Sequence, residues 1–239
     1  MNGIKTPTTV DIMIHAMSKE IRDNEISATG TLSPIPAAAC YLAQMTTAPQ
    51  TLPAILDAPD WPFEGELEEL FNLMQRGRVG LFFLSGAQID KSANTNLVSI
   101  GSPQRPKVRL PGGAGTAMVY LHAKRVVLFL RHQTVRSLVE KVDFVTGPGT
   151  GDIPERTGGP TRLITDLAVF DIKPNQGLTL SSLHPGVDFE EVRAKTGFEL
   201  DRPKDLKVTE VPSPRILELI HGPVKEKVSL VYPLFASEL

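Results

Sequence analysis

Two continuous apolar runs constrain the fold of this chain more than any other feature of its sequence. They are Val79–Leu84 and Arg125–Leu130, of which the second is apolar after Arg125. Neither run alternates apolar with polar residues, as a half-exposed strand does. Runs of this kind mark strands that are covered on both faces, as in parallel sheets. The largely apolar stretch Leu163–Phe170 predicts a further strand, followed by a turn at Lys173–Gly177.

Helical patterns separate these strands along the chain. Apolar residues three and four apart predict a helix from Thr9 to Asp23, and Thr8 with Asp11 gives a capping signal at its start. The other predicted elements are helices over residues 34–45, 64–75, 188–195 and 214–221 and short strands over 25–29 and 52–56. Because strands alternate with helices, we expect an α/β fold with an open, mostly parallel sheet covered by helices on both faces.

We expect a single domain over residues 1–239. The sequence contains no evident internal repeat and no convincing linker, and 239 residues suffice for a substantial core. Residues 223–239 follow the last predicted helix and are predicted to form a C-terminal arm that packs on a partner.

Charge and composition argue against several classes of function. The net charge of −2 gives no general electrostatic case for binding nucleic acid or an anionic membrane. No apolar run approaches the roughly 20 residues that span a bilayer. The lone cysteine, Cys40, cannot form an internal disulfide, and the first residues lack the apolar core of a signal peptide, so a cytoplasmic location is expected. The five histidines have no metal-ligand spacing, and no metal is expected.

Several amide side chains follow the first apolar run. Gln88 comes just beyond the carboxyl end of that predicted strand, at the edge where open α/β sheets place ligands, and Asn94 and Asn96 lie in the next loop. Neutral amides can donate to an acyl oxygen without needing a particular pH. The alternative is that these amides only satisfy the loop backbone, and their spacing leaves both interpretations open.

A glycine-rich turn, Pro111–Gly115, offers bare backbone N–H groups that could hold a carbonyl oxygen. It is not a dinucleotide-binding fingerprint, because no glycine stands three residues after Gly115. A second stretch, Gly147–Gly151, lacks the Lys-Ser/Thr pair of a P-loop and is interpreted as a flexible loop.

Taken together in order, these segments resemble the β (small) subunit of glutaconate CoA-transferase, in family I of the CoA-transferase superfamily. The resemblance covers roughly residues 10 to 220. The blocks that carry it are Thr29–Pro34, Thr47–Pro49, Phe83–Asp90, Asn94–Asn96, Ile100–Gly101, Arg105–Arg109, Val139–Thr146, Leu163–Phe170, Leu183–Gly186 and Thr196–Phe198.

The resemblance implies a heteromer, αβ or α2β2, with a larger α subunit and an acyl-CoA bound in the cleft between the two. CoA would be part of the substrate, and no cofactor is implied. In the family's transferases a glutamate of the small subunit attacks the thioester and passes CoA to a second acid, which is covalent catalysis by a carboxylate. Gln88 and Gly113 are the implied oxyanion-type residues. The implied substrate-binding residues are Ser33, Leu56, Asn94, Asn96, Gly112, Ala114 and Gly115.

The chain departs from this pattern at the nucleophile. Leu56 stands where the family carries glutamate, and Ala114 replaces a glycine of the turn. Asp57 is one methylene shorter than glutamate, and on a strand it would point to the opposite face from Leu56. A one-residue slip in the alignment would nevertheless make Asp57 the nucleophile of a transferase.

Two branches of the superfamily also lack the glutamate: cofactor-free decarboxylases of a glutaconyl-type CoA ester, and hydrolases that cleave a CoA-linked ring. The Pro-Gly-x-Ala-Gly turn and the short span from Pro49 to Glu64 look more like the decarboxylase branch. We therefore expect decarboxylation. The alternatives are a CoA transferase that uses Asp57 or a partner carboxylate, a C–C hydrolase, and a non-catalytic structural subunit.

Overall fold

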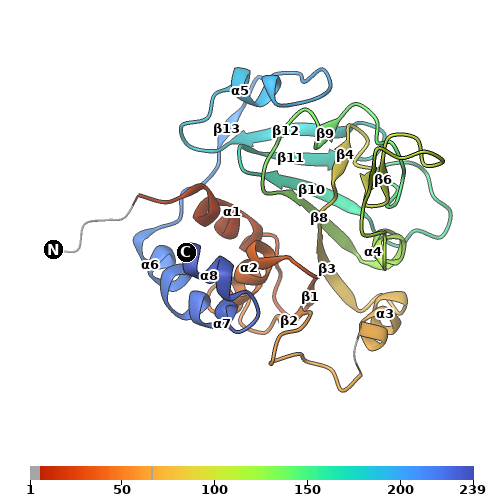
Figure 1. Ribbon diagram of the computed structural model, residues 1–239. Helices are drawn as coiled ribbons and strands as arrows, with labels where there is room; N and C mark the ends of the chain where they lie inside the picture. The colour runs from red at the N-terminus through yellow and green to blue at the C-terminus, as the bar shows by residue number, and fades with distance from the viewer. Residues whose placement is uncertain (1–5, 66) are drawn as a thin grey trace.

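One eight-stranded sheet organises the chain, and the computed structural model describes residues 6–65 and 67–239. The strands are β1 Ile26–Thr29, β2 Leu52–Ile55, β3 Val79–Leu84, β8 Arg125–Leu130, β10 Pro160–Thr165, β11 Ala168–Lys173, β12 Gly177–Leu183 and β13 Lys207–Val208. Their order is β13-β12-β11-β10-β8-β3-β1-β2 (Figure 1). The five strands from β2 to β10 run parallel, and only β11 pairs antiparallel with its neighbours. The expected α/β fold class is confirmed.

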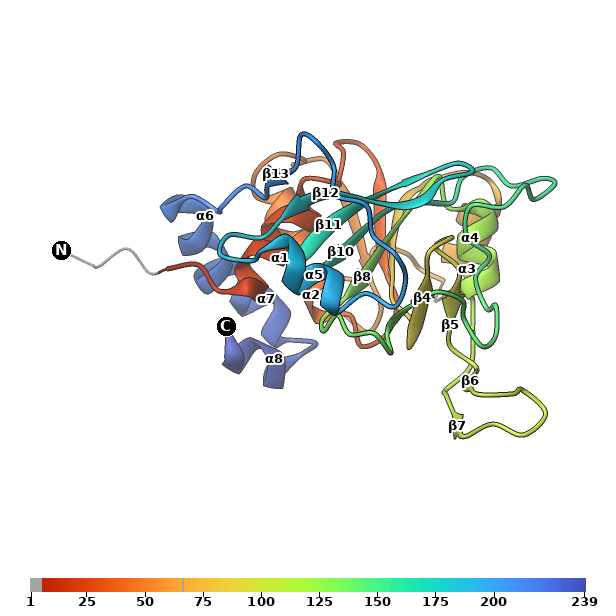
Figure 2. The ribbon, with the colours of Figure 1, turned by 90° about the horizontal axis from the view of Figure 1, so that it is seen from above.

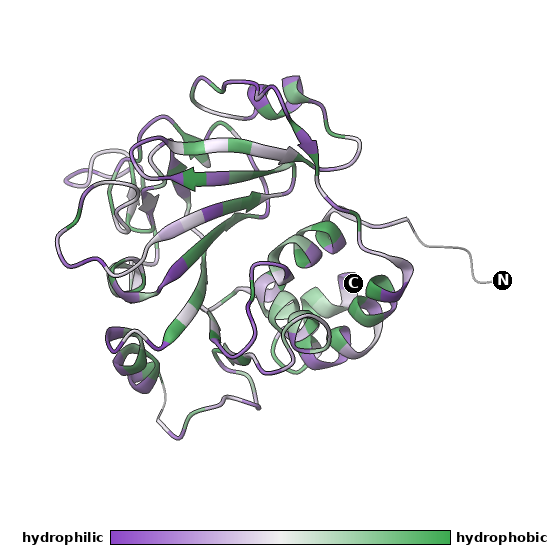
Figure 3. Cartoon of the chain, turned by 180° about the vertical axis from the view of Figure 1, so that it is seen from behind, coloured by the Kyte–Doolittle hydropathy of each residue, from purple (hydrophilic) through white to green (hydrophobic). Residues whose placement is uncertain are grey.

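Helices cover both faces of this sheet. They are α1 Thr9–Ser18, α2 Pro34–Gln44, α3 Leu67–Gln75, α4 Thr116–His122, α5 Phe189–Ala194, α6 Pro214–Leu219, a π-helical turn Ile220–Val224, α7 Lys225–Ser229 and α8 Pro233–Glu238. Alternate residues of β3 and β8 face opposite sides: Phe83 and Val127 pack with α1, α2 and the C-terminal helices, whereas Phe82 and Leu128 pack with α3 and α4. Figure 3 shows hydrophobic residues along the central strands and on the helices that cover them.

Short strands that the sequence analysis did not predict surround one edge of the sheet. A three-stranded sheet contains β4 Gln88–Asp90, β5 Thr95–Asn96 and β9 Leu138–Val139. A separate hairpin pairs β6 Ser99–Ile100 with β7 Val108–Arg109 and projects from the body of the molecule (Figure 2). Strands of two or three residues are too short to leave a periodic pattern in the sequence.

Two predicted boundaries were wrong. The first helix ends at Ser18 and not at Asp23, although its predicted capping signal is confirmed by the reciprocal hydrogen bonds of Thr8 and Asp11. The stretch Leu163–Phe170 is not one strand but the corner of the β10–β11 hairpin. The Thr165 hydroxyl closes that corner by accepting the N–H of Leu167 at 3.1 Å and of Ala168 at 3.0 Å.

The C-terminal segment also folds differently from expectation. Gly222 does not end the last helix, because the chain continues through a kink there (φ −112°, ψ −107°) into α7 and α8. Val224 and Val228 are fully buried in the same cluster as α2. Residues 223–239, predicted as an arm, therefore pack on their own sheet, and a contact with a partner stays a prediction.

Candidate active site

The carboxyl ends of four parallel strands meet at one edge of the sheet. In the strand register Thr29 of β1 lies beside Ile55 of β2 and Phe83 of β3, and Leu84 lies beside Leu128 of β8. The loops that leave these strands are therefore neighbours, as in other open α/β sheets. They carry the predicted site residues Ser33, Leu56, Asp57 and Gln88.

Leu56 and Asp57 form the turn that follows β2. Leu56 is half-buried, whereas Asp57 is exposed and has a left-handed backbone with φ 67°. The N–H of Ala58 donates to the Ile55 carbonyl at 3.1 Å and closes the turn. Because β2 ends at Ile55, Leu56 lies outside the strand predicted over residues 52–56, and strand alternation does not apply to Leu56 and Asp57.

Tyr232 reaches this edge from the segment between α7 and α8. The backbone N–H of the buried Ser33 donates to the Tyr232 hydroxyl oxygen at 3.3 Å. Burial raises the pKa of Tyr232; the hydrogen bond from Ser33 opposes this shift, and the charge of Asp57 adds to it. The sequence gives no signal for this residue, because only the folded C-terminal helices bring it to the ends of β1 and β2.

Gln88 and Asn96 belong to a buried hydrogen-bond network. The Asn96 amide donates to Gln88 Oε1 at 2.7 Å and to the Ser99 carbonyl at 2.7 Å. Gln88 Nε2 donates to Asp143 Oδ2 at 3.0 Å, and Gln88 Oε1 also accepts the Asp143 N–H at 3.0 Å. Asp143 Oδ2 further accepts the N–H of Gly101 at 2.9 Å, which ties the residue after β6 to the same network. Both amides are thus engaged within the protein.

Asn94 has a similar set of internal partners. Its amide nitrogen donates to the buried Asp90 carboxylate at 3.0 and 3.1 Å, and its Oδ1 accepts the N–H of Gly149 at 2.7 Å. A side chain at Gly149 would overlap the Ser92 carbonyl, so glycine is required there by close packing. The stretch Gly147–Gly151, interpreted from sequence as a flexible loop, is fastened to the loop after β4.

The glycine turn joins the β6–β7 hairpin to α4 and is held from both sides. The N–H of Gly112 (φ 108°) donates to the Leu97 carbonyl at 2.9 Å, and the Leu97 N–H donates to Thr146 Oγ1 at 2.9 Å. A Cβ at Gly113 would overlap the Thr146 methyl group, and a Cβ at Gly115 would overlap the Phe71 ring. Ala114 is exposed and has φ 41°. The amide network and the turn therefore share one support, the segment around Leu97 between β5 and β6.

The predicted site residues fall into two groups. Gln88, Asn94, Asn96 and residues 112–115 form one, and Ser33, Leu56 and Asp57, together with Tyr232, form the other. Helix α4 ends just before the amino end of β8, so the turn at its start lies toward the carboxyl edge with both groups. Within residues 6–65 and 67–239, no hydrogen bond or ion pair joins one group to the other.

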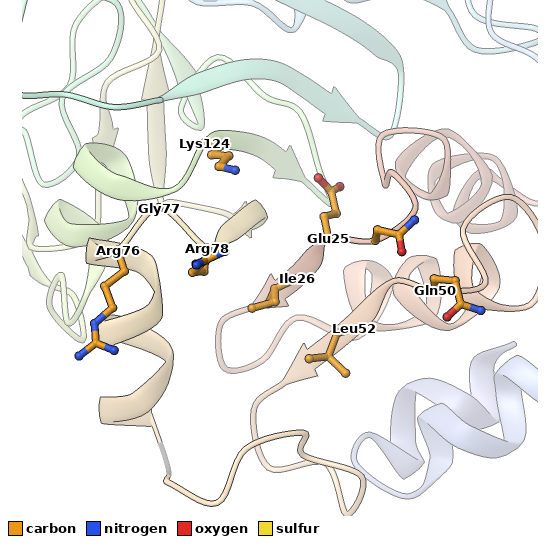
Figure 4. A pocket seen from close by; sticks show the side chains of 9 residues that line it. Glu25, Ile26, Gln50, Leu52, Arg76, Gly77, Arg78 and Lys124 are labelled. Carbon is orange, nitrogen blue, oxygen red and sulfur yellow. The ribbon is translucent and has the colours of Figure 1, made fainter.

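A cavity of about 560 Å³ lies at the opposite edge of the sheet (Figure 4). It is next to the amino ends of β1, β2, β3 and β8, and its lining includes Arg76, Arg78 and Lys124. None of the predicted site residues lines it. In the described part of the chain, no group of three or more His, Cys, Asp or Glu residues could hold a metal ion. None of the described helices is long and apolar enough to cross a bilayer.

We infer that Asn96 supports the loop and does not contact substrate. Asn96→Ala would remove the hydrogen bonds from its amide to Gln88 Oε1 and to the Ser99 carbonyl, and those that its Oδ1 accepts from the N–H groups of Val98 and Ser99, so we expect the free energy of unfolding to fall by about 3 kcal/mol. Urea unfolding measures this change, with Gln104→Ala as the control because Gln104 is an exposed amide in the hairpin. Unchanged stability with lost activity would instead favour a direct contact between Asn96 and the acyl group.

Comparison with known proteins agrees with this geometry. Residues 57–195 match the coenzyme A transferase family. A 3-oxoadipate CoA-transferase subunit from Pseudomonas knackmussii is 30% identical over 245 residues, covering 90% of this chain and 92% of that protein. The cholesterol ring-cleaving hydrolase IpdB subunit of Rhodococcus jostii is 30% identical over 207 residues, covering 79% of this chain and 81% of that protein. The crystal structure of the decarboxylase AibA/AibB superposes with a TM-score of 0.81 and 26% identity, covering 97% of this chain and 98% of that chain.

The family match spans more than half of the sequence and includes the loops around Gln88 and the glycine turn. The resemblance expected from the sequence blocks is confirmed. This chain belongs to the coenzyme A transferase family.

Proposed function

We propose that this chain is the β subunit of a heteromeric enzyme that decarboxylates a glutaconyl-type CoA ester without a bound cofactor. Its partner is a larger α subunit of the same superfamily, in an αβ or α2β2 assembly, and its location is cytoplasmic. The observation that carries the proposal is Leu56, a half-buried apolar residue where the resemblance places the transferase glutamate. The near-complete superposition on the decarboxylase AibA/AibB supports it.

The reaction needs no covalent bond to the protein. The bond between the γ-carbon and the carboxylate breaks, CO2 leaves, and the electron pair enters the conjugated thioester as a dienolate. A proton then adds to carbon and completes the product. An apolar wall at Leu56 disfavours the localised charge of the carboxylate relative to the dispersed charge of the transition state.

Two groups of this chain fit the remaining steps. The N–H groups of the turn at Gly113 stabilise negative charge on the thioester oxygen, and Gln88 with Asn96 positions that turn through Leu97. Tyr232 accepts a hydrogen bond from Ser33, so its own proton is free for donation, and its raised pKa keeps the phenol protonated at neutral pH. We assign Tyr232 as the proton donor to the dienolate.

The test is an assay of the complex with its α subunit on glutaconyl-CoA carrying a labelled γ-carboxylate, with acetate present as a possible acceptor. We expect labelled CO2 and crotonyl-CoA. Acetyl-CoA and free glutaconate without CO2 would overturn decarboxylation in favour of transfer. A product of C–C hydrolysis from a CoA-linked ring substrate, without CO2 from glutaconyl-CoA, would favour the hydrolase branch, to which the similarity with IpdB points.

The second candidate is CoA transfer with Asp57 as the nucleophile. It is favoured by one observation: Asp57 is exposed in the turn after β2, at the same edge as Leu56. The similarity to a 3-oxoadipate CoA-transferase subunit over 90% of the chain also supports it. We rank it second because Asp57 is shorter than glutamate and follows the expected position by one residue.

A further inference from the structure

Three cations cluster on the projecting β6–β7 hairpin. Arg105, Lys107 and Arg109 occupy alternate positions, and all three are exposed. Among the described residues, none of them takes part in an ion pair, although the molecule as a whole carries a net charge of −2. Three unpaired charges of one sign on a single short hairpin attract multiply charged anions.

The hairpin and the glycine turn form one continuous ribbon. Lys107 N–H donates to the Ile100 carbonyl at 2.8 Å, Leu110 N–H to Val98 at 3.0 Å, and Gly112 N–H to Leu97 at 2.9 Å. Arg109 therefore lies only three residues from the first glycine of the turn, on the same hydrogen-bonded ladder. A ligand whose reacting end lies at the turn can extend along the ribbon toward these cations.

The position of the Lys107 side chain is restricted by its neighbour across the hairpin. The Lys107 stem packs where a side chain at Gly101 would otherwise stand, so its direction is restricted. The Asp143 carboxylate accepts hydrogen bonds from Gln88 and Gly101. Neither Lys107 nor Arg109 forms an ion pair with this carboxylate.

We propose that the β6–β7 hairpin binds the phosphate groups of the CoA ester through Arg105, Lys107 and Arg109. The proposal rests on the proposed function, because it takes the substrate to be a CoA thioester. Such a ligand joins its thioester to a pyrophosphate and a 3′-phosphate through a long flexible arm, which matches a ribbon with an oxyanion turn at one end and cations at the other. Arginine suits this role because its fork donates two hydrogen bonds to one phosphate.

The test compares two substrates that differ only in the phosphates and the attached nucleoside: the acyl-CoA and the corresponding acyl-pantetheine, which has no nucleotide. The variant is R105Q/K107Q/R109Q in the assembled complex. The matched control is R76Q/R78Q/K124Q, which removes two arginines and one lysine at the opposite edge of the sheet. Calorimetric binding of free coenzyme A is measured in parallel, since it does not require turnover.

We expect the hairpin variant to raise KM for the acyl-CoA by about tenfold or more, as for the loss of charge-assisted hydrogen bonds. Its preference for acyl-CoA over acyl-pantetheine should collapse, and its binding of coenzyme A should weaken by a similar factor and depend less on salt. The control variant should behave as wild type.

Three outcomes would overturn the proposal: an unchanged KM for acyl-CoA, an equal rise in KM for acyl-pantetheine, or dissociation of the complex on size-exclusion chromatography, which would make the hairpin a subunit contact. Coenzyme A binding that depends on the hairpin, with no turnover by the wild type, would retain this proposal and reject the proposed reaction.

Discussion

Replacing Gly113 with alanine is expected to lower kcat of the complex by about 100-fold. The new Cβ would overlap the Thr146 methyl group, and Thr146 cannot rotate away without losing the hydrogen bond that its Oγ1 accepts from Leu97. The turn must then move, and loss of one oxyanion donor typically costs about 100- to 1,000-fold in kcat. Steady-state kinetics of the assembled complex measure the effect, and thermal unfolding checks that the variant is folded.

A second substitution makes this prediction specific. Thr146→Ser removes the methyl group that the new Cβ would strike and keeps the hydroxyl that Leu97 uses. Gly113 is not among the residues with positive φ, so its backbone tolerates an alanine. We therefore expect G113A/T146S to recover most of the activity and T146S alone to stay near wild type. Full activity in G113A, or no recovery in the double variant, would contradict the assigned role of the turn.

Leu56→Glu is expected to abolish most decarboxylation and to introduce covalent chemistry. A carboxylate at this position restores the family's nucleophile and also places a negative charge near the carboxylate that the substrate must lose. We expect the release of CO2 to fall by about 100-fold, with a protein-bound CoA thioester appearing at residue 56. Product analysis and intact-protein mass spectrometry measure both effects.

The matched controls are Leu56→Gln and Asp57→Asn. Glutamine has the size of glutamate but cannot attack a thioester, so L56Q should form no adduct. Asp57 has no part in the proposed decarboxylation, so D57N should keep its rate within about twofold, as is usual for an exposed position. If D57N lost activity and L56E did not, Asp57 would be the nucleophile and the chain a transferase.

The sequence predicted the sheet well where a local pattern carried the information. The strands β3 and β8 are buried on both faces, so successive residues must be apolar, and the continuous apolar runs in the sequence show this directly. The β10–β11 corner was missed because Leu167 and Ala168 continue the apolar run while the Thr165 side chain closes the turn. The last helix was predicted to end at residue 221, but hydrophobic residues further on, such as Val224, pack on the sheet, and the helical segment continues through a kink at Gly222.

The candidate site was predictable in its location but not in its internal bonding. The position of Gln88 beyond a parallel strand follows from local order along the chain. Its hydrogen-bond partner Asp143 is 55 residues further along the chain, so the spacing of residues in the sequence could not predict this hydrogen bond. The same holds for the hydrogen bond between Leu97 and Thr146 that supports the turn. Tyr232 lies 199 residues from Ser33 and meets it only because the C-terminal helices pack beside α2.

The central claim is that this enzyme breaks a C–C bond without a protein nucleophile. The most direct test is mass spectrometry of the complex with its α subunit after turnover of glutaconyl-CoA, following both subunits and the small molecules together. We predict CO2 and crotonyl-CoA with both subunits at their unmodified mass, before and after borohydride trapping. A CoA thioester on Asp57 or on a carboxylate of the α subunit, without release of CO2, would contradict the claim.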